Sequence, residues 1–158
     1  MKKNLRGFTL IEMLNIALSV REAQVYGLSV QSFASSFQVG YGIHFASATS
    51  YILFADTNAS KRYDAGTDSI VRTYSVGQGH LVKQFCGLLS DGSAQCSDDA
   101  ANPIDHLDVV FFRPDPDANI SSSNPTYYSS GKIVVTSPSG ETRTITIAST
   151  GQISVTNP

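Results

Sequence analysis

The chain has 158 residues, a length that suits one domain of ordinary size. Apolar residues make up 41% of it and charged residues only 15%, which excludes a disordered acidic chain, a basic nucleic-acid arm and a coiled coil. The formal charge of the whole chain is −2, from eleven basic and thirteen acidic residues. Residues 1–7 contain three of the basic residues, so the rest of the chain carries a formal charge of −5. Because an acidic body does not attract phosphate backbones, we expect a β-rich domain outside the cytoplasm rather than a nucleic-acid-binding protein.

The first twenty residues, MKKNLRGFTLIEMLNIALSV, place a short basic segment directly before an apolar run. That order is typical of an export signal, but no small-x-small cleavage site follows the run before Arg21. The apolar run instead continues into a helix-like stretch, so we expect the break at Gly7, before the run. The basic residues of the leader would hold it on the cytoplasmic face of the membrane.

The segment RGFTLIEML at residues 6–14 resembles the cleavage and methylation motif of type IV prepilins and type II secretion pseudopilins. The resemblance implies that a membrane prepilin peptidase removes residues 1–7 and methylates the new amino terminus, which makes Gly7 and Phe8 the processing residues. Glu12 matches the family's acidic residue, whose partner during assembly is the amino terminus of a neighbouring subunit. A carboxylate inside an apolar run costs roughly 2.5–3.5 kcal/mol on insertion scales, so it needs such a partner. The alternative is an amphipathic helix with Glu12 on its wet face.

The apolar run from Phe8 to Val20 is 13 residues long and contains polar side chains and Glu12. A membrane span needs about 20 apolar residues, and 13 residues cover roughly 20 Å of a hydrocarbon core about 30 Å thick. The run looks as if a piece of membrane helix were missing after Leu14. The resemblance implies a single-pass protein of the cytoplasmic membrane with its head outside the cytoplasm, while the short run predicts weakened insertion.

Helical spacing continues beyond the run and predicts an amphipathic helix that packs one face on a sheet and ends near Phe37, before Gly40 and Gly42. Gly27 is expected to weaken this helix by up to about 1 kcal/mol relative to alanine. Beyond residue 40 the pattern alternates, and turn signals separate the segments. The expected strands are Tyr41–Ala46, Ser50–Ala55, Ile70–Val76, His80–Phe85, Leu107–Phe112, Lys132–Thr136, Thr142–Ile147 and Gln152–Val155.

The predicted fold class is α+β, with a pilin-like N-terminal α-helix packed on a C-terminal antiparallel β-rich head, either a sandwich or two small sheets. The domain organisation is a leader at residues 1–7, a hydrophobic and amphipathic helix at 8–37 and a β-rich head at 38–158. Within the head, residues 132–155 are expected to form a three-stranded meander. The Ser-, Asn-, Asp- and Pro-rich segment 115–128 is the longest expected loop.

The head is also similar to the H-type pseudopilin/FimT group. The residues concerned are YGIHF at 41–45, YILFADTN at 51–58, VFFRP at 110–114, and the apolar alternation of 131–153. This similarity implies a minor pilin or pseudopilin near the tip of a filament. Its partners would be the prepilin peptidase, other pilin or pseudopilin subunits, the secretion or pilus assembly platform, and the membrane through the N-terminal helix. No nucleic-acid partner is expected.

Cys86 and Cys96 are the two cysteines of the chain, and the turn signal Ser90-Asp91-Gly92 lies between them. The two could face each other across a hairpin, and outside the cytoplasm a disulfide is then expected. Two free thiols or a metal pair are the alternatives. The three histidines, His44, His80 and His106, are scattered without ligand spacing, which argues against a zinc site.

A calcium loop is the weak metal candidate of this sequence, and its ligands would be Asp56, Asn58, Ser60, Asp64 and Asp68. Lys61 stands where the loop needs glycine, and no bidentate glutamate follows. We therefore favour a polar loop between two strands over a calcium cofactor. A second echo of such a loop, at residues 115–119, is weaker still.

The sequence offers little for catalysis, because it contains no nucleophile elbow, paired-glycine phosphate loop or HExxH. Asp105-His106 is interpreted as a solvated turn rather than part of a triad. The prediction is a non-enzymatic subunit of a type IV pilus or type II secretion pseudopilus. The alternatives are a DNA-uptake minor pilin that binds DNA through its head, a secreted hydrolase with a lipophilic anchor, and a relic with a shortened helix.

Overall fold

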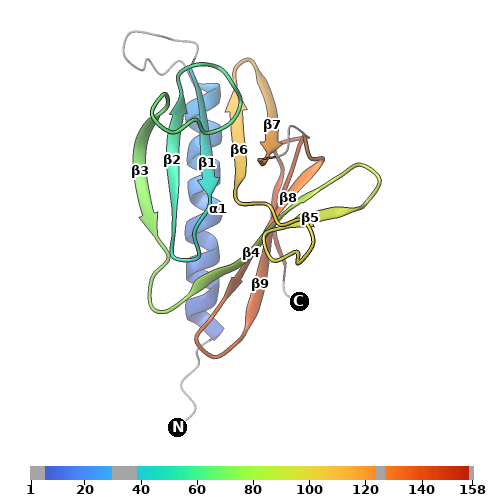
Figure 1. Cartoon of the computed structure of the whole chain (residues 1–158). Helices are drawn as coiled ribbons and strands as arrows, with labels where there is room; N and C mark the ends of the chain where they lie inside the picture. The colour runs from blue at the N-terminus through green and yellow to red at the C-terminus, as the bar shows by residue number, and fades with distance from the viewer. Residues whose placement is uncertain (1–5, 30–38, 124–126, 157–158) are drawn as a thin grey trace.

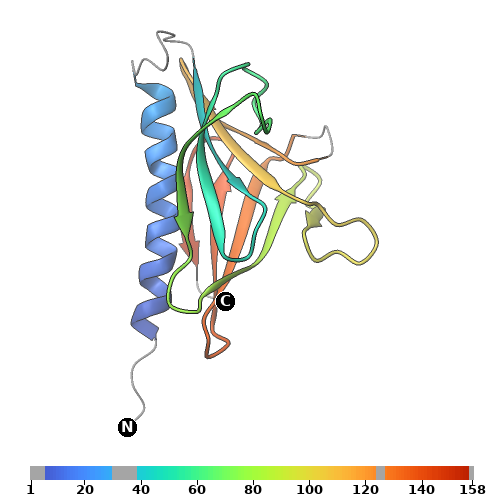
Figure 2. The ribbon, with the colours of Figure 1, turned by 60° about the vertical axis from the view of Figure 1, so that its left-hand side comes forward.

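The N-terminal helix lies along one side of two antiparallel β-sheets (Figures 1 and 2). The computed structural model describes residues 6–29, 39–123 and 127–156, with side chains from residue 11 onward. The elements are α1 (Arg6–Leu28), β1 (Gly40–Phe45), β2 (Ser50–Asp56), β3 (Ser69–Ser75), β4 (Leu81–Leu88), β5 (Ala94–Cys96), β6 (Leu107–Phe112), β7 (Asp115–Ser121), β8 (Ser130–Thr136), β9 (Thr142–Ala148) and β10 (Ile153–Thr156). The predicted α+β class with a β-rich head is confirmed, and the head consists of two sheets.

Each sheet has five strands, in the orders β3-β2-β1-β6-β7 and β10-β9-β8-β4-β5. The predicted C-terminal meander is confirmed, because β8 pairs with β9 and β9 with β10. The prediction of a loop over 115–128 was wrong in its first half, where β7 pairs with β6 and places Ile120 opposite Val109. Pairing with an already formed strand and burial of Ala118 and Ile120 outweigh a local composition that favours turns.

The hydrophobic core lies between the two sheets and the inward face of α1. Strand β8 shows why, since its buried and partly exposed residues alternate and direct Ile133 and Val135 inward. Phe45 of β1 and Phe111 of β6 are fully buried in the same cluster. The helix adds Met13, Ile16, Val20 and Ala23, all at most 1% exposed. The helix is therefore part of the core of the head along much of its length.

Close backbone approach fixes the C-terminal half of α1 on the first sheet. A Cβ atom at Gly27 would lie 2.4 Å from the carbonyl oxygen of Phe111, so glycine is needed there for contact. From the sequence, Gly27 was predicted only to weaken the helix. Polar contacts also join helix and head: Ser19 Oγ lies 3.1 Å from Tyr51 Oη, and Gln24 Nε2 donates to the carbonyl oxygen of Gly151 at 3.3 Å. The predicted helix extended to residue 37; α1 ends at Leu28, and residues 30–38 lie outside the described chain.

Candidate assembly surface

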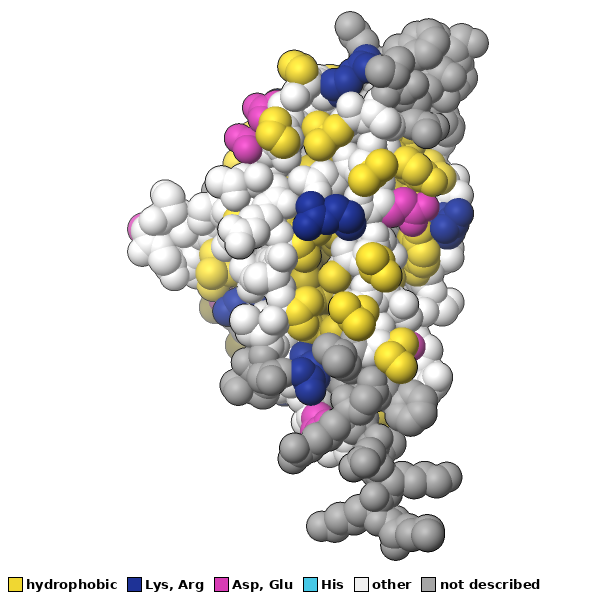
Figure 3. All heavy atoms as spheres, turned by 180° about the vertical axis from the view of Figure 1, so that it is seen from behind, with side chains coloured by type: hydrophobic (Ala, Val, Ile, Leu, Met, Phe, Trp, Pro, Cys, Tyr) yellow, Lys and Arg dark blue, Asp and Glu magenta, His cyan; other side chains and the backbone are white. Residues whose placement is uncertain are grey.

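The helix α1 presents two apolar stripes, one on each side. The inward stripe, Met13, Ile16, Val20, Ala23 and Gly27, repeats at spacings of three and four and is buried in the head. A second set at the same spacings points away from the head; we call it the outer stripe, and it consists of Ile11, Leu14, Leu18, Arg21 and Val25. Its four apolar side chains are 46–64% exposed. Figure 3 shows apolar side chains gathered on this side of the molecule, with charged groups among them.

A shallow groove of about 180 Å³ runs beside the outer stripe, between α1 and β10. Leu14, Leu18 and Arg21 line its helix side, and Ile153 and Val155 line its sheet side. Ala17 also lines the groove, and its small side chain leaves the hollow between the two larger leucines and the strand. Apolar groups that line a concave surface beside an exposed apolar ridge are typical of a protein contact surface.

The predicted processing residues, Gly7 and Phe8, belong to the first turns of α1 by their backbone, and the described side chains begin after them. The rest of the predicted leader, residues 1–5, lies outside the described chain. Glu12 is partly buried, and one carboxylate oxygen accepts a hydrogen bond of 3.4 Å from the amide of Gly77 in the β3–β4 loop. Its pairing with a neighbouring subunit stays a prediction.

A polar network borders α1 on the side of the first sheet. Tyr74 donates a short hydrogen bond to Glu22, and Arg72 Nη1 lies 3.5 Å from the same carboxylate. Burial and the Glu22 carboxylate both raise the pKa of Tyr74. Burial also raises the pKa of Tyr51, whose ring stacks on Tyr74, to about 12. The Glu22 carboxylate is thus engaged by Tyr74 and Arg72 of β3.

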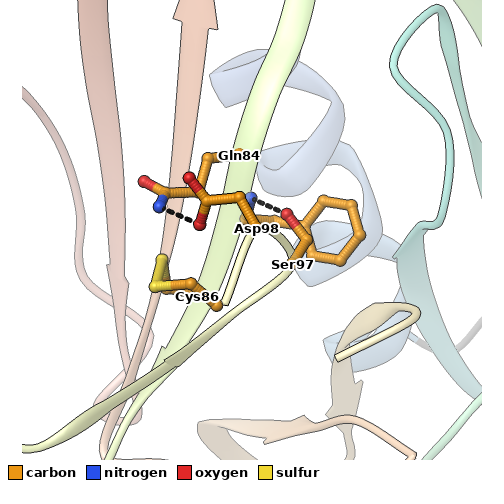
Figure 4. The surroundings of a disulfide bond; sticks show 6 residues. Gln84, Cys86, Ser97 and Asp98 are labelled. Atoms are coloured by element: carbon orange, nitrogen blue, oxygen red, sulfur yellow. Dashed lines mark hydrogen bonds between the residues drawn. A yellow bond between two sulfur atoms is a disulfide. The ribbon is translucent and has the colours of Figure 1, made fainter. Parts of the chain in front are cut away.

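The disulfide prediction is confirmed, since Cys86 and Cys96 are bonded directly across the β4–β5 hairpin. Figure 4 shows how the turn that follows β5 is attached beside the bond. Gln84 Nε2 donates to a carboxylate oxygen of Asp98, and the amide of Phe85 donates to Ser97 Oγ at 3.1 Å. The cystine therefore fixes a short strand that has little other pairing.

The side chains that would be the ligands of the weak calcium candidate form hydrogen bonds within their own loop. The Asp56 carboxylate is 1% exposed and accepts hydrogen bonds from the amides of Ser60 and Lys61. Burial raises its pKa, while hydrogen bonds from the side chains of Ser60 and Asn58 lower that of Asp64. Asp68 accepts from the amides of Thr57 and Asp64. Across the described residues no group of three or more His, Cys, Asp or Glu side chains gathers in a metal-binding arrangement.

The fold also assembles a histidine–aspartate cluster that sequence reasoning missed. Asp108 is fully buried; one of its oxygens lies 2.6 Å from His44 Nδ1 and the other 3.5 Å from His106 Nε2. The amide of Tyr63 donates to the same carboxylate at 2.9 Å. His106 Nδ1 also lies 2.7 Å from Asp105, whose pKa is lowered by a hydrogen bond with Ser123 and by His106. The turn at Asp105-His106, predicted to be solvated, is thus anchored to β1 and β6 through Asp108. In the sequence, this cluster was indicated only by the spacing of His106 and Asp108, which places both side chains on one face of a strand.

Comparison with known proteins gives no family for this chain: no family model, no curated protein and no solved structure matches it. The assignment of a function therefore depends on the residues and on the geometry described above. Within residues 6–29, 39–123 and 127–156, no helix combines the length and the apolar character that crossing a membrane requires.

Proposed function

We propose that this chain is a minor pilin or pseudopilin subunit that assembles into a type IV pilus or a type II secretion pseudopilus, near its tip. A prepilin peptidase would process it between Gly7 and Phe8, and the head would lie outside the cytoplasm. Its role would be structural rather than catalytic. The observation that carries the proposal is the outer stripe: an exposed apolar face on a helix that begins with a prepilin-like motif.

The energetics of α1 support an assembly role. The inward stripe already secures the helix on the head, so exposure of the outer stripe does not reflect a helix that has failed to dock. An exposed large apolar group gains on the order of 1.5–3 kcal/mol when it is fully buried, so a row of them favours association. The disulfide supports a location outside the cytoplasm, where such bonds persist.

The test of the proposed processing is the intact mass of the full chain after co-expression with a prepilin peptidase. The expected product lacks residues 1–7 and carries one added methyl group. The matched control is Gly7→Val, which places a branched side chain at the cleavage position and should leave the chain uncut. An unprocessed wild-type chain beside a processed control prepilin would contradict the proposal.

A further inference from the structure

The outer stripe is interrupted by one charged residue, and that residue restricts what can cover the stripe. Its members follow one another at intervals of three, four, three and four residues, and Arg21 is the fourth of the five. Such spacing keeps one seam facing a partner over several turns, as in two helices that pack knobs into holes. The seam is therefore suited to a second α-helix, which would lie along α1 with the groove beside β10 at its edge.

Arg21 is bonded to a neutral side chain of its own helix. Its guanidinium donates at 2.5 Å to Gln24 Oε1 on the same helix, and among the described residues no carboxylate lies within ion-pair distance of it. Glu22 is the neighbouring acid, and its carboxylate is bound by Tyr74 and Arg72 of β3. Burial of a guanidinium without a counter-charge is costly, so a helix that covers the stripe must supply a carboxylate at this level.

A second copy of the chain does not meet this requirement. The outer stripe contains no acidic residue. A parallel copy in register would place Arg21 against Arg21, and like charges in a desolvated contact repel. An antiparallel copy that aligns the apolar positions would place Arg21 against Leu18, which offers no acceptor.

We propose that the outer stripe docks an α-helix of a different protein, with apolar residues at alternating spacings of three and four and with an Asp or Glu opposite Arg21. Leu14, Leu18 and Val25 would be the apolar knobs, and the hollow at Ala17 would receive a large apolar side chain of the partner. The carboxylate would set the register and exclude self-pairing. This inference rests on the proposed function and specifies its partner.

The test uses two synthetic amphipathic helical peptides with a leucine seam at this spacing. They are identical except for one central seam residue, which is Glu in the first and Lys in the second. Binding to the full chain is measured by fluorescence anisotropy at low salt. We expect the Glu peptide to bind about tenfold more tightly than the Lys peptide, a difference of about 1.4 kcal/mol. Arg21→Glu should reverse that preference.

The matched control is Lys83→Glu, which makes the same charge change at an exposed position on β4 and should keep the wild-type preference. Equal affinity for the two peptides, binding by neither, or an unchanged preference in Arg21→Glu would overturn the inference. So would self-association of the wild-type chain through the stripe in sedimentation velocity. The cleavage assay is independent: a processed chain without the Glu preference removes only this inference, whereas an unprocessed chain with the preference removes the prepilin assignment and keeps the surface.

Discussion

The two faces of α1 carry similar side chains and meet opposite surroundings. Met13 and Ile16 on the inward face are fully or almost fully buried, while Leu14 and Leu18 on the outer face are 46% and 64% exposed. Hydrophobicity alone does not separate these faces. The head decides the difference, because its sheets cover one stripe and leave the other open. An apolar residue of α1 therefore joins the core or stays exposed according to its angular position on the helix.

The largest expected effect comes from truncation of the inward face. Ile16→Ala removes a side chain that is 1% exposed and leaves a cavity between α1 and the sheets, which should cost about 2–5 kcal/mol of unfolding free energy. Leu18→Ala, the matched change on the outer face, should alter it by at most about 0.5 kcal/mol. Denaturant unfolding of the two variants measures the difference, and similar losses would abolish the distinction between the faces.

A smaller effect is expected from Gly27→Ala. Alanine favours an isolated helix by about 1 kcal/mol over glycine. The added Cβ would lie 2.4 Å from the carbonyl oxygen of Phe111, and such overpacking costs about 1–3 kcal/mol. We expect a net loss of stability in thermal unfolding. The difference between Asn15→Ala and Asn15→Gly, at an exposed position of the same helix, calibrates helix propensity alone. A Gly27→Ala gain equal to that difference would show that helix and sheet are not in close contact.

The smallest effect is a fall in the unfolding free energy at alkaline pH, caused by a buried tyrosine at the contact between helix and sheet. The pKa of Tyr51 is raised to about 12 in the folded chain, chiefly by burial, from 10.0. As the pH rises, the Tyr51 hydroxyl loses its proton in the unfolded state before it does so in the folded state. The contribution of Tyr51 to stability is therefore fully present below pH 10 and is lost as the pH rises from 10 toward 12. Denaturant unfolding at pH 8 and pH 11 should show a fall that Tyr51→Phe reduces. The pKa values of Tyr26, Tyr41 and Tyr74 are also raised, so part of the fall should remain. An identical fall in Tyr51→Phe would exclude this tyrosine as a contributor.

Much of the fold was predictable where side-chain alternation is strong. The meander β8 to β10 follows from apolar residues at every second position between glycine-containing turns. Strand β5 has three residues, which is too short for any periodicity to appear. Strand β7 begins with Asp115-Pro116-Asp117, a local turn pattern, and becomes a strand only because β6 pairs with it. Pairing with the preceding strand of the hairpin decided both cases, and the residues of β5 or β7 alone do not encode it.

The candidate surface was predictable only in part. The prepilin-like motif and the cysteine pairing could be predicted from local sequence. The outer stripe was hidden because the apolar run from Phe8 was interpreted as one membrane segment, although the spacing of Ile11, Leu14 and Leu18 was visible in it. Which stripe the head covers depends on how the sheets curve around α1. The cluster of His44, Asp108 and His106 was hidden for the same reason, since β1 and β6 become neighbours only in the folded chain.

The most direct test of the central claim, that the inward face folds the chain and the outer face binds a partner helix, is the affinity of Leu18→Ala for the Glu peptide. We predict a loss of affinity of about tenfold or more, the order expected when an exposed anchor of a binding seam is truncated, with an unfolding free energy close to that of the wild type. Unchanged affinity in a stably folded Leu18→Ala variant would contradict the claim, because the outer stripe would then be exposed without serving as a binding surface.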